Sequence, residues 1–284
     1  MADREGKRIT STPGQIAAYT LLVLGALVSL TPLYWLVVTS LRPEGAEFTY
    51  PPEWMPSSLH PENYAMAWRR APFWIFTRNS VVVTFSSILG TLITASMAAY
   101  AFARVRFWGR DVWFGLLLST MMLPWAATLI PRFLLFQRLH LIDSLWPLII
   151  PFWCGGGAFY VFLLRQFYLT LPIEMEEAAL VDGASRLRIY LQITLPLSRP
   201  ALASVGVFSF IRHWNDFMGP LIFTNRESSR TLALGLRYFG HEQFAEFRLV
   251  MAVATLMMVP VLFVFFAANK YFVTGVALSG LAGR

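Results

Sequence analysis

Six long apolar segments divide the sequence, and each is close to the roughly 20 residues that an α-helix needs to cross a bilayer. They cover about 15–41, 79–103, 112–131, 145–164, 200–223 and 249–272. Only 14% of the 284 residues are charged, whereas roughly a quarter is usual in a soluble domain. We therefore predict an all-α membrane protein with six transmembrane helices, forming a single transmembrane domain over residues 1–284.

The basic residues at the start of the chain resemble those of a secretory signal. Arg4, Lys7 and Arg8 precede the first apolar segment, but this segment is long and has no small-residue cleavage site, so it is expected to remain as an anchor. The net charge of +7 comes from arginines scattered over many loops. This pattern is typical of membrane borders and argues against nucleic acid as a partner. The single cysteine, Cys154, excludes an intramolecular disulfide.

The fourth apolar segment contains residues that interrupt a helix. Pro147 and Pro151 are followed by three glycines at 155–157, so backbone groups are freed at membrane depth and need partners there. Two interpretations remain open: a broken helix that lines a transport path, or close helix packing against small residues.

Residues 165–199 form the longest loop that we expect on the cytoplasmic side, and its chemistry predicts two short helices. Pro172 suits a first helical turn. The carboxylates of Glu174, Glu176 and Glu177 are favourable near the positive end of the helix dipole. Gly183 is suited to a left-handed terminating residue, and a second helical stretch then runs to Pro196.

The loop also carries a recognisable pattern. Glu177, Ala178 and Ala179 are followed by Asp182 and Gly183, and then by Ile193, Leu195 and Pro196. This pattern resembles the coupling loop of permease subunits in binding-protein-dependent ABC importers. Further motifs point to the carbohydrate-type branch, similar to the second permease of maltose and glycerol-phosphate importers: residues 162–167, Trp214-Asn215-Asp216-Phe217 and the tail Tyr271-Phe272-Val273 with Gly275.

The resemblance implies a type I ABC importer permease fold and a set of partners. These are a dimer of ABC ATPase subunits, which docks on residues 172–196, a second permease in a heterodimer, and an extracytoplasmic solute-binding protein. The implied solute is a sugar, an oligosaccharide or a related polyol or sugar phosphate. The implied ATPase-coupling residues are Glu177, Ala178, Ala179, Asp182 and Gly183.

We expect no catalysis and no bound cofactor in this chain. It has no G-x-x-x-x-G-K-[ST] sequence for phosphate binding, so ATP and Mg²⁺ are expected in the partner ATPase. The four histidines, at 60, 140, 213 and 241, are far apart in sequence, and no metal site is expected. The resemblance places the chain in a prokaryotic cytoplasmic (inner) membrane with both termini cytoplasmic. The basic residues, 12 inside and 10 outside on this topology, are too evenly divided to fix it.

Trp214, Asn215 and Asp216 lie with Arg212 and His213 deep in the fifth segment. Ionisable groups are costly in lipid and usually face a bundle interior or water, so these residues are candidates for the translocation path or its gate. The other interpretation is an Arg212–Asp216 pair, four residues apart, that satisfies itself. An alternative function, a stand-alone ion-coupled transporter, predicts several such carboxylates, and Asp216 is the one clear example.

The polar segment between the fifth and sixth apolar segments, about 224–248, carries charges of both signs and two glycines. We expect it to be an adaptable external loop that contacts the solute-binding protein. The simpler alternative is a solvated connector.

Overall fold

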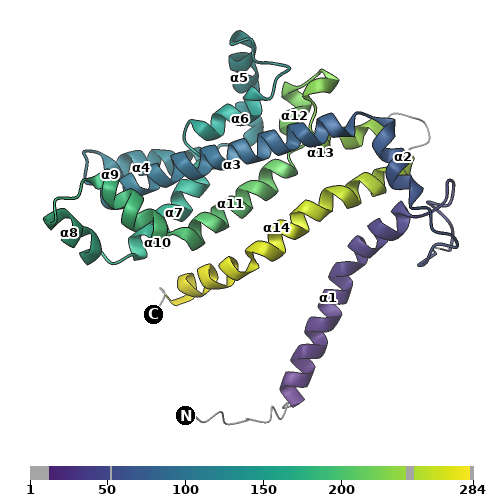
Figure 1. Cartoon of the computed structure of the whole chain (residues 1–284), viewed down its shortest axis with the longest axis horizontal. Coiled ribbons are helices and arrows are strands. Elements are labelled where there is room, and N and C mark those ends of the chain that lie inside the picture. The colour runs from purple at the N-terminus through teal and green to yellow at the C-terminus, as the bar shows by residue number, and fades with distance from the viewer. Residues whose placement is uncertain (1–12, 52, 241–245, 282–284) are drawn as a thin grey trace. The chain divides into compact units, whose positions relative to one another are not determined.

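The computed structural model describes residues 13–281 apart from residues 52 and 241–245. Within this part of the chain every regular element is a helix (Figure 1). In chain order the helices are α1 (Pro13–Ser40), α2 (Glu62–Arg70), α3 (Phe73–Arg104), α4 (Arg110–Ser119), η1 (Thr120–Met122), α5 (Trp125–Arg138), α6 (Trp146–Trp153), α7 (Ala158–Thr170), α8 (Glu174–Val181), α9 (Arg186–Ile189), η2 (Tyr190–Thr194), α10 (Leu195–Leu197), α11 (Arg199–Trp214), α12 (Met218–Phe223), η3 (Glu227–Ser229), α13 (Leu232–Gly235), η4 (Leu236–Gly240) and α14 (Phe247–Leu281).

The chain forms two compact units. The first contains residues 1–67 and 239–255, and the second contains residues 68–238 and 256–284. In the first unit, α1 and the start of α14 are joined by the loop at 41–61. Most of α1 exposes apolar side chains, and burial in this helix begins only at its last residues, Val38, Thr39 and Ser40.

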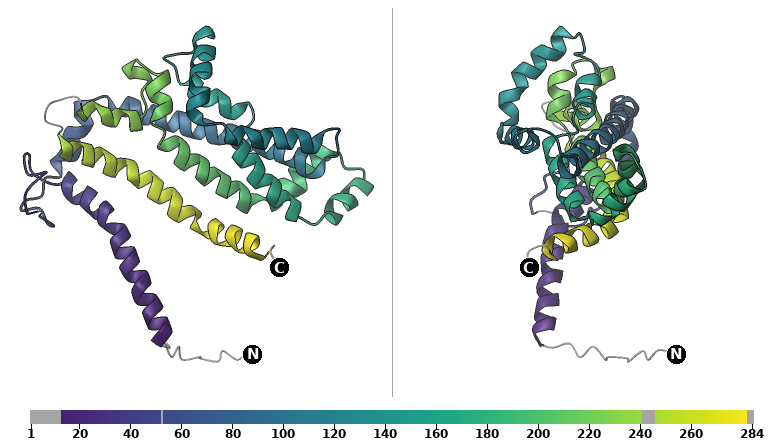
Figure 2. Two further views of the ribbon diagram at one scale, coloured as in Figure 1. Left: turned by 180° about the vertical axis from the view of Figure 1, so that it is seen from behind. Right: turned by 90° about the vertical axis from the view of Figure 1, so that its left-hand side faces the viewer.

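Helix α3 is the centre of the second unit, where it packs against α6, α7 and α11 (Figures 1 and 2). Its packing face carries Ala95, Ala99 and Ala103, which are all buried. Small residues let membrane helices approach closely, because apolar surface alone gives no preference for protein over lipid. Larger side chains from α7 and α11 fill the space against them, including Val161, Leu164, Tyr168 and Val205.

The fourth apolar segment is broken, as expected from its prolines and glycines. Helix α6 ends at Trp153 and α7 starts at Ala158, and Gly155, Gly156 and Gly157 all have positive φ. Hydroxyl groups of α3 compensate for the break. Thr94 Oγ1 donates to the carbonyl of Phe152 at 3.1 Å, which satisfies one of the carbonyls left free at the end of α6.

The glycine break also allows the closest approach in this packing. A Cβ atom on Gly156 would lie 2.6 Å from the Cβ of Ala95 and 2.8 Å from its backbone nitrogen. The packing interpretation of the glycine run is therefore confirmed at Gly156. Gly157 meanwhile lines a cavity, and the transport-path interpretation stays a prediction at that residue.

Two further parts of the chain are bent instead of forming one continuous helix. Residues 110–138 bend by 99° between Met122 and Trp125, and residues 186–214 bend by 77° between Leu197 and Arg199. The first bend has a clear cause at Pro124, which lacks an N–H group and disfavours helical backbone at Leu123. Leu123 is extended, with ψ 119°. The expected span 200–223 also ends early, because α11 stops at Trp214. In the described part of the chain, four helices are long and apolar enough to cross a membrane, or up to six if each bent pair is one span.

The Gly156 contact gives a stability prediction. Gly156→Ala introduces a clash with Ala95 and a side chain at φ +66°, so it should lower the free energy of unfolding by roughly 2 kcal/mol or more. Unfolding in a titration with sodium dodecyl sulfate measures this. Gly206→Ala in α11 is the matched control, since its new Cβ meets nothing within 4 Å and alanine favours a helix. Equal destabilisation by both changes would contradict the packing role.

Candidate functional site

Helix α8 begins and ends as its sequence predicts. Glu174, Glu176 and Glu177 occupy its first turn, where carboxylates favour the positive end of the dipole. At the other end Gly183 has φ +79°, and two crossed hydrogen bonds close the helix: Ala184 N–H to Ala179 O at 2.9 Å and Gly183 N–H to Leu180 O at 3.0 Å. This Schellman motif reverses the chain so that α9 can follow directly.

Glu176 is the carboxylate that attaches α8 to the second unit. Its side chain and that of Arg104, the last residue of α3, are each only 6% exposed, and Oε1 of Glu176 lies 3.3 Å from Nε of Arg104. The Nε group makes no hydrogen bond, so the attraction is that of an ion pair. The guanidinium of Arg104 also donates to the carbonyls of Tyr168 and Leu171. One buried arginine therefore holds the end of α3, the end of α7 and the start of α8 together.

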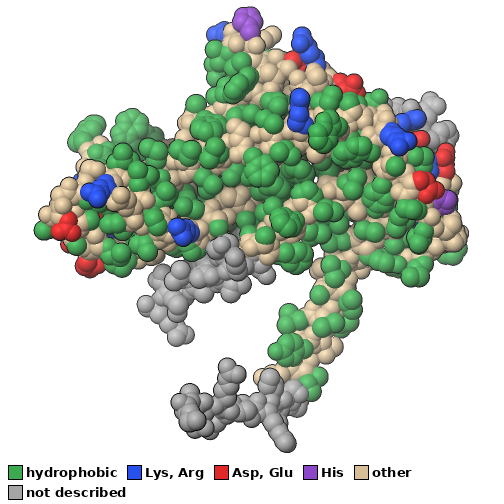
Figure 3. Space-filling view, viewed as in Figure 1, with side chains coloured by type: hydrophobic (Ala, Val, Ile, Leu, Met, Phe, Trp, Pro, Cys, Tyr) green, Lys and Arg blue, Asp and Glu red, His purple; other side chains and the backbone are tan. Residues whose placement is uncertain are grey.

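Most of the residues predicted to couple this chain to an ATPase are exposed, unlike Glu176. Glu177, Ala178, Asp182 and Gly183 are exposed, and Ala179 is half-buried. Apolar side chains with no cover surround them: Val181 is 88% exposed, and Leu187 and Leu191 are also exposed. At the end of the molecule where α8 lies, Figure 3 shows acidic and basic side chains beside hydrophobic ones. We call residues 174–192 the corner.

The far end of α3 anchors a different segment. Asn79 donates to the carbonyls of Ser228 and Arg230 at 2.8 and 2.9 Å, and Ser80 Oγ accepts from the N–H of Leu232 at 2.8 Å. Asn79 and Arg104 are 25 residues apart on one helix, about 37 Å at 1.5 Å per residue. This exceeds the roughly 30 Å of the hydrocarbon core. The corner and residues 228–232 therefore lie at opposite ends of a helix long enough to cross a bilayer (Figure 1).

Asp143 holds the residues that directly precede 228–232. Its carboxylate accepts hydrogen bonds from the backbone N–H groups of Asn225 and Arg226, and these bonds hold the pKa of Asp143 below its usual value. Residues 231–235 are buried against α3, so the expectation of an adaptable loop is wrong there. The exposed residues in the described part of this segment are the turn at 225–228 and, further along, Arg237 and Tyr238. His241 and Glu242 lie outside the described residues.

A cavity of about 780 Å³ lies between these two ends of the second unit. Its lining comes from η1, α5, α6, α7, α11 and α12 and includes aromatic residues and three charged ones: Trp125, Phe159, Tyr160, Arg132, Arg212 and Asp216. His213 also lines it, and its buried Nε2 has no hydrogen-bond partner among the described residues. The His213 ring packs edge-on against Phe152, with centroids 4.2 Å apart.

The three residues expected in the path occupy different surroundings. Trp214 is buried, donates from Nε1 to the carbonyl of Met257 at 3.0 Å and stacks on Phe210. Asn215 is exposed and donates to Ile211 O. Asp216 lines the cavity. Its side chain accepts a hydrogen bond at 3.1 Å from the N–H of Gly219, in the first turn of α12. Arg212 lies over the Phe152 ring at 5.9 Å.

Among the described residues, no group of three or more His, Cys, Asp or Glu side chains is arranged to hold a metal ion. The corner presents exposed charged and apolar groups, and the cavity is lined by aromatic, aliphatic and charged side chains.

Comparison with known proteins decides the family. A family described as "Binding-protein-dependent transport system inner membrane component" matches residues 69–277. The chain belongs to this family. It is 31% identical to a probable ABC transporter permease, YurM of Bacillus subtilis, over 95% of this chain and 89% of that protein. It is also 32% identical to the sn-glycerol-3-phosphate transport system permease UgpE of Salmonella choleraesuis, over 92% of this chain and 95% of that protein.

Three further proteins extend the comparison. The diacetylchitobiose uptake permease DasC of Streptomyces coelicolor is 29% identical, over 89% of this chain and 91% of that protein. A bacterial ABC transporter that imports alginate has a chain with a TM-score of 0.80 and 26% identity, covering 90% of this chain and 95% of that one. The methionine transporter MetNI, at TM-score 0.55 and 16% identity, shares the fold. The chain is thus an importer permease of the inner membrane, from a family of non-catalytic subunits.

Sequence reasoning missed Glu176, although it lies directly before the recognised pattern. The pattern drew attention to Glu177, whose side chain is exposed. The available signal was Arg104, a lone arginine at the end of a long apolar helix, which needs a partner if it is buried.

The buried pair predicts different losses of stability for substitutions at Glu176 and at Glu177. Glu176→Gln leaves Arg104 without a full counter-charge and should lower the free energy of unfolding by about 3 kcal/mol. Glu177→Gln changes an exposed group and should shift it by less than about 0.5 kcal/mol. Titration with sodium dodecyl sulfate measures both. Similar losses in the two variants would show that the Arg104–Glu176 pair does not hold α8.

Proposed function

We propose that this permease is one of two membrane subunits of an ATP-driven importer for a sugar, an oligosaccharide or a related polyol or sugar phosphate. The named substrates of its relatives support this class: glycerol phosphate, diacetylchitobiose and alginate. The cavity supports it too, since aromatic faces such as Trp125 and Tyr160 suit sugar rings. Arg132 and Arg212 suit hydroxyl or phosphate oxygens.

The second part of the proposal concerns energy coupling. The corner docks on an ATPase subunit of a dimer, which binds ATP and Mg²⁺, and this chain contributes no catalytic group. The observation that carries this part is a difference in burial along α8. Glu176 faces inward and fixes the helix, while Glu177, Asp182 and Val181 are exposed for a partner. A movement of the ATPase against the corner passes through Arg104 to α3.

The third part concerns orientation. The corner and both chain termini are cytoplasmic, and the turn at 225–228 is external, where it meets the solute-binding protein. Support comes from the separation of the corner and this turn along α3 and from the family's dependence on a binding protein. A second, different permease subunit completes the path around the cavity.

Coupling is tested by two substitutions with matched controls. Glu177→Arg reverses an exposed charge at the docking surface. Gly183→Val places a β-branched residue at φ +79°, in open space, so its effect arises from backbone strain alone. Each should reduce solute-stimulated ATP hydrolysis by the purified transporter roughly tenfold, equivalent to about 1.4 kcal/mol of coupling.

The controls for this test are Glu177→Gln, which adds no opposite charge, and Gly183→Asn, since asparagine tolerates left-handed backbone. Both should retain most activity. Normal solute-stimulated hydrolysis and uptake in Glu177→Arg and Gly183→Val would refute the coupling role. Uptake by the chain without any ATPase would instead favour an ion-coupled transporter.

Orientation is tested by labelling single cysteines in a Cys154→Ser background. Glu227→Cys and Arg188→Cys place thiols at exposed positions on opposite sides of the membrane. A membrane-impermeant maleimide should label position 227 in intact cells and position 188 only after permeabilisation. The reverse pattern would overturn the proposed topology.

A further inference from the structure

The loop that follows α1 in the first unit folds back along that helix. The hydroxyl of Tyr34 donates to the carbonyl of Trp54 at 2.6 Å, and the rings of Trp35 and Trp54 meet edge to face at 5.9 Å. Tyr34 precedes the end of α1 at Ser40 by six residues, or about 9 Å along the axis. Trp54 therefore lies closer to the bilayer centre than the end of the membrane-spanning helix from which the loop departs.

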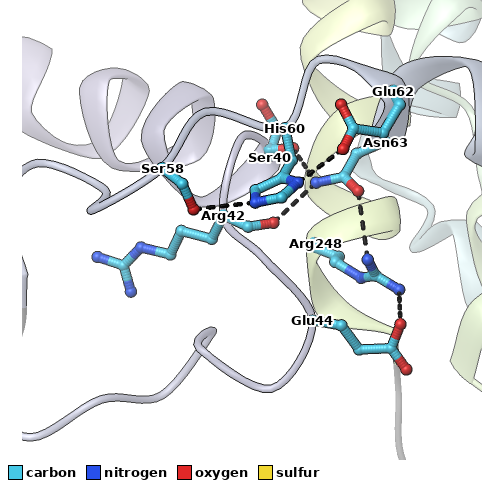
Figure 4. Close-up of polar contacts among 8 residues, drawn as sticks. All are labelled: Ser40, Arg42, Glu44, Ser58, His60, Glu62, Asn63 and Arg248. Carbon is cyan, nitrogen blue, oxygen red and sulfur yellow. Dashed lines mark hydrogen bonds and ion pairs between the residues drawn. The ribbon is translucent and has the colours of Figure 1, made fainter.

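The loop is held in this position by a buried cluster of polar groups (Figure 4). Arg42 is 1% exposed, and its guanidinium donates to the carbonyls of Ala46, Glu47 and Glu53. Its charge lies 4.6 Å from the centre of the Trp35 ring. Because these carbonyls converge on Arg42, the loop backbone is tied around one side chain.

A second arginine, from the start of α14, reinforces the same loop. Arg248 pairs with Glu44 at 2.5 Å and Glu47 at 3.7 Å and donates to Asn63 Oδ1 at 3.3 Å. Asn63 in turn donates to the carbonyls of Ser40 and Arg42. Arg248 and Asn63 thus tie Glu44 to the backbone at residues 40 and 42 (Figure 4).

Beside the exposed Glu53, the loop presents several large apolar side chains without cover. Tyr50 is 97% exposed and Met55 79% exposed, and Phe48 and Trp54 are exposed as well. Phe48 also contacts Phe247, the first residue of α14, with ring centroids 5.1 Å apart. Phe247 begins the second membrane-spanning helix of this unit. The exposed side chains therefore lie at the level where two spanning helices leave the hydrocarbon core.

We propose that residues 48–51 and 53–55 form an interfacial membrane anchor, with Tyr50, Trp54 and Met55 inserted among the lipid headgroups on the Ser40 side of α1. Tyr and Trp are favoured at this depth, because their rings are apolar and their polar groups stay near water. A soluble protein that docks on the membrane surface meets the end of α1 first, whereas Trp54 lies below that end. This inference does not depend on the proposed function.

The test places an environment-sensitive fluorophore, nitrobenzoxadiazole, on single cysteines in the Cys154→Ser background. Tyr50→Cys and Met55→Cys report on the anchor. Ala65→Cys, an exposed position on α2, is the control, since Asn63 places the start of α2 at the end of α1. The transporter is reconstituted in phosphatidylcholine nanodiscs, with and without a lipid that carries a nitroxide at the top of its acyl chain.

The nitroxide lipid should quench positions 50 and 55 at least twofold more strongly than position 65, and aqueous iodide should show the opposite order. The use of two anchor positions keeps the test valid if one variant fails to fold. The proposal is overturned if positions 50 and 55 are as accessible to iodide as position 65 and are not quenched by the nitroxide lipid. That result would mean that the loop faces water and is free for a soluble partner.

Discussion

The buried ion pair between Arg104 and Glu176 is the interaction on which the arrangement of the functional ends depends. Taking two charges out of water is costly, and such a pair stabilises a fold only when further hydrogen bonds satisfy it. Here the guanidinium also binds the carbonyls of Tyr168 and Leu171. The pair therefore fixes α8 against α3 and α7 at one point and leaves the rest of α8 free to meet a partner. In the proposed coupling, a force that an ATPase applies to the corner reaches α3 through this contact.

Helix α3 can transmit that force because it is packed along its whole length. Its alanines allow close contact with α7, and its hydroxyl groups bind the carbonyls of the broken α6. At its far end Asn79 and Ser80 hold residues 228–232. One helix thus connects the corner, the helices that line the cavity and residues 228–232.

Much of this was predictable from local sequence. The first-turn carboxylates, the left-handed Gly183 and the break at 155–157 are local effects, and the structure confirms each one. Burial was not predictable in the same way. Glu176 and Glu177 are adjacent residues of the same type, and the contacts of Glu176 with Tyr100, with Arg186 and with Arg104, 72 positions earlier in the chain, separate their roles. Likewise, the sequence made Trp214 a candidate for the transport path. Its ring instead stacks on Phe210 and donates a hydrogen bond to α14, and it does not line the cavity.

The central claim is that the Arg104–Glu176 pair holds the corner rigidly on α3. Val181 on α8 and Trp108, just beyond α3, are both strongly exposed and can carry spin labels. Pulsed electron paramagnetic resonance measures the distribution of distances between the two labels. The account predicts one narrow distribution in the parent protein and in Glu177→Gln, and a markedly broader or shifted one in Glu176→Gln. An unchanged distribution in Glu176→Gln would contradict it.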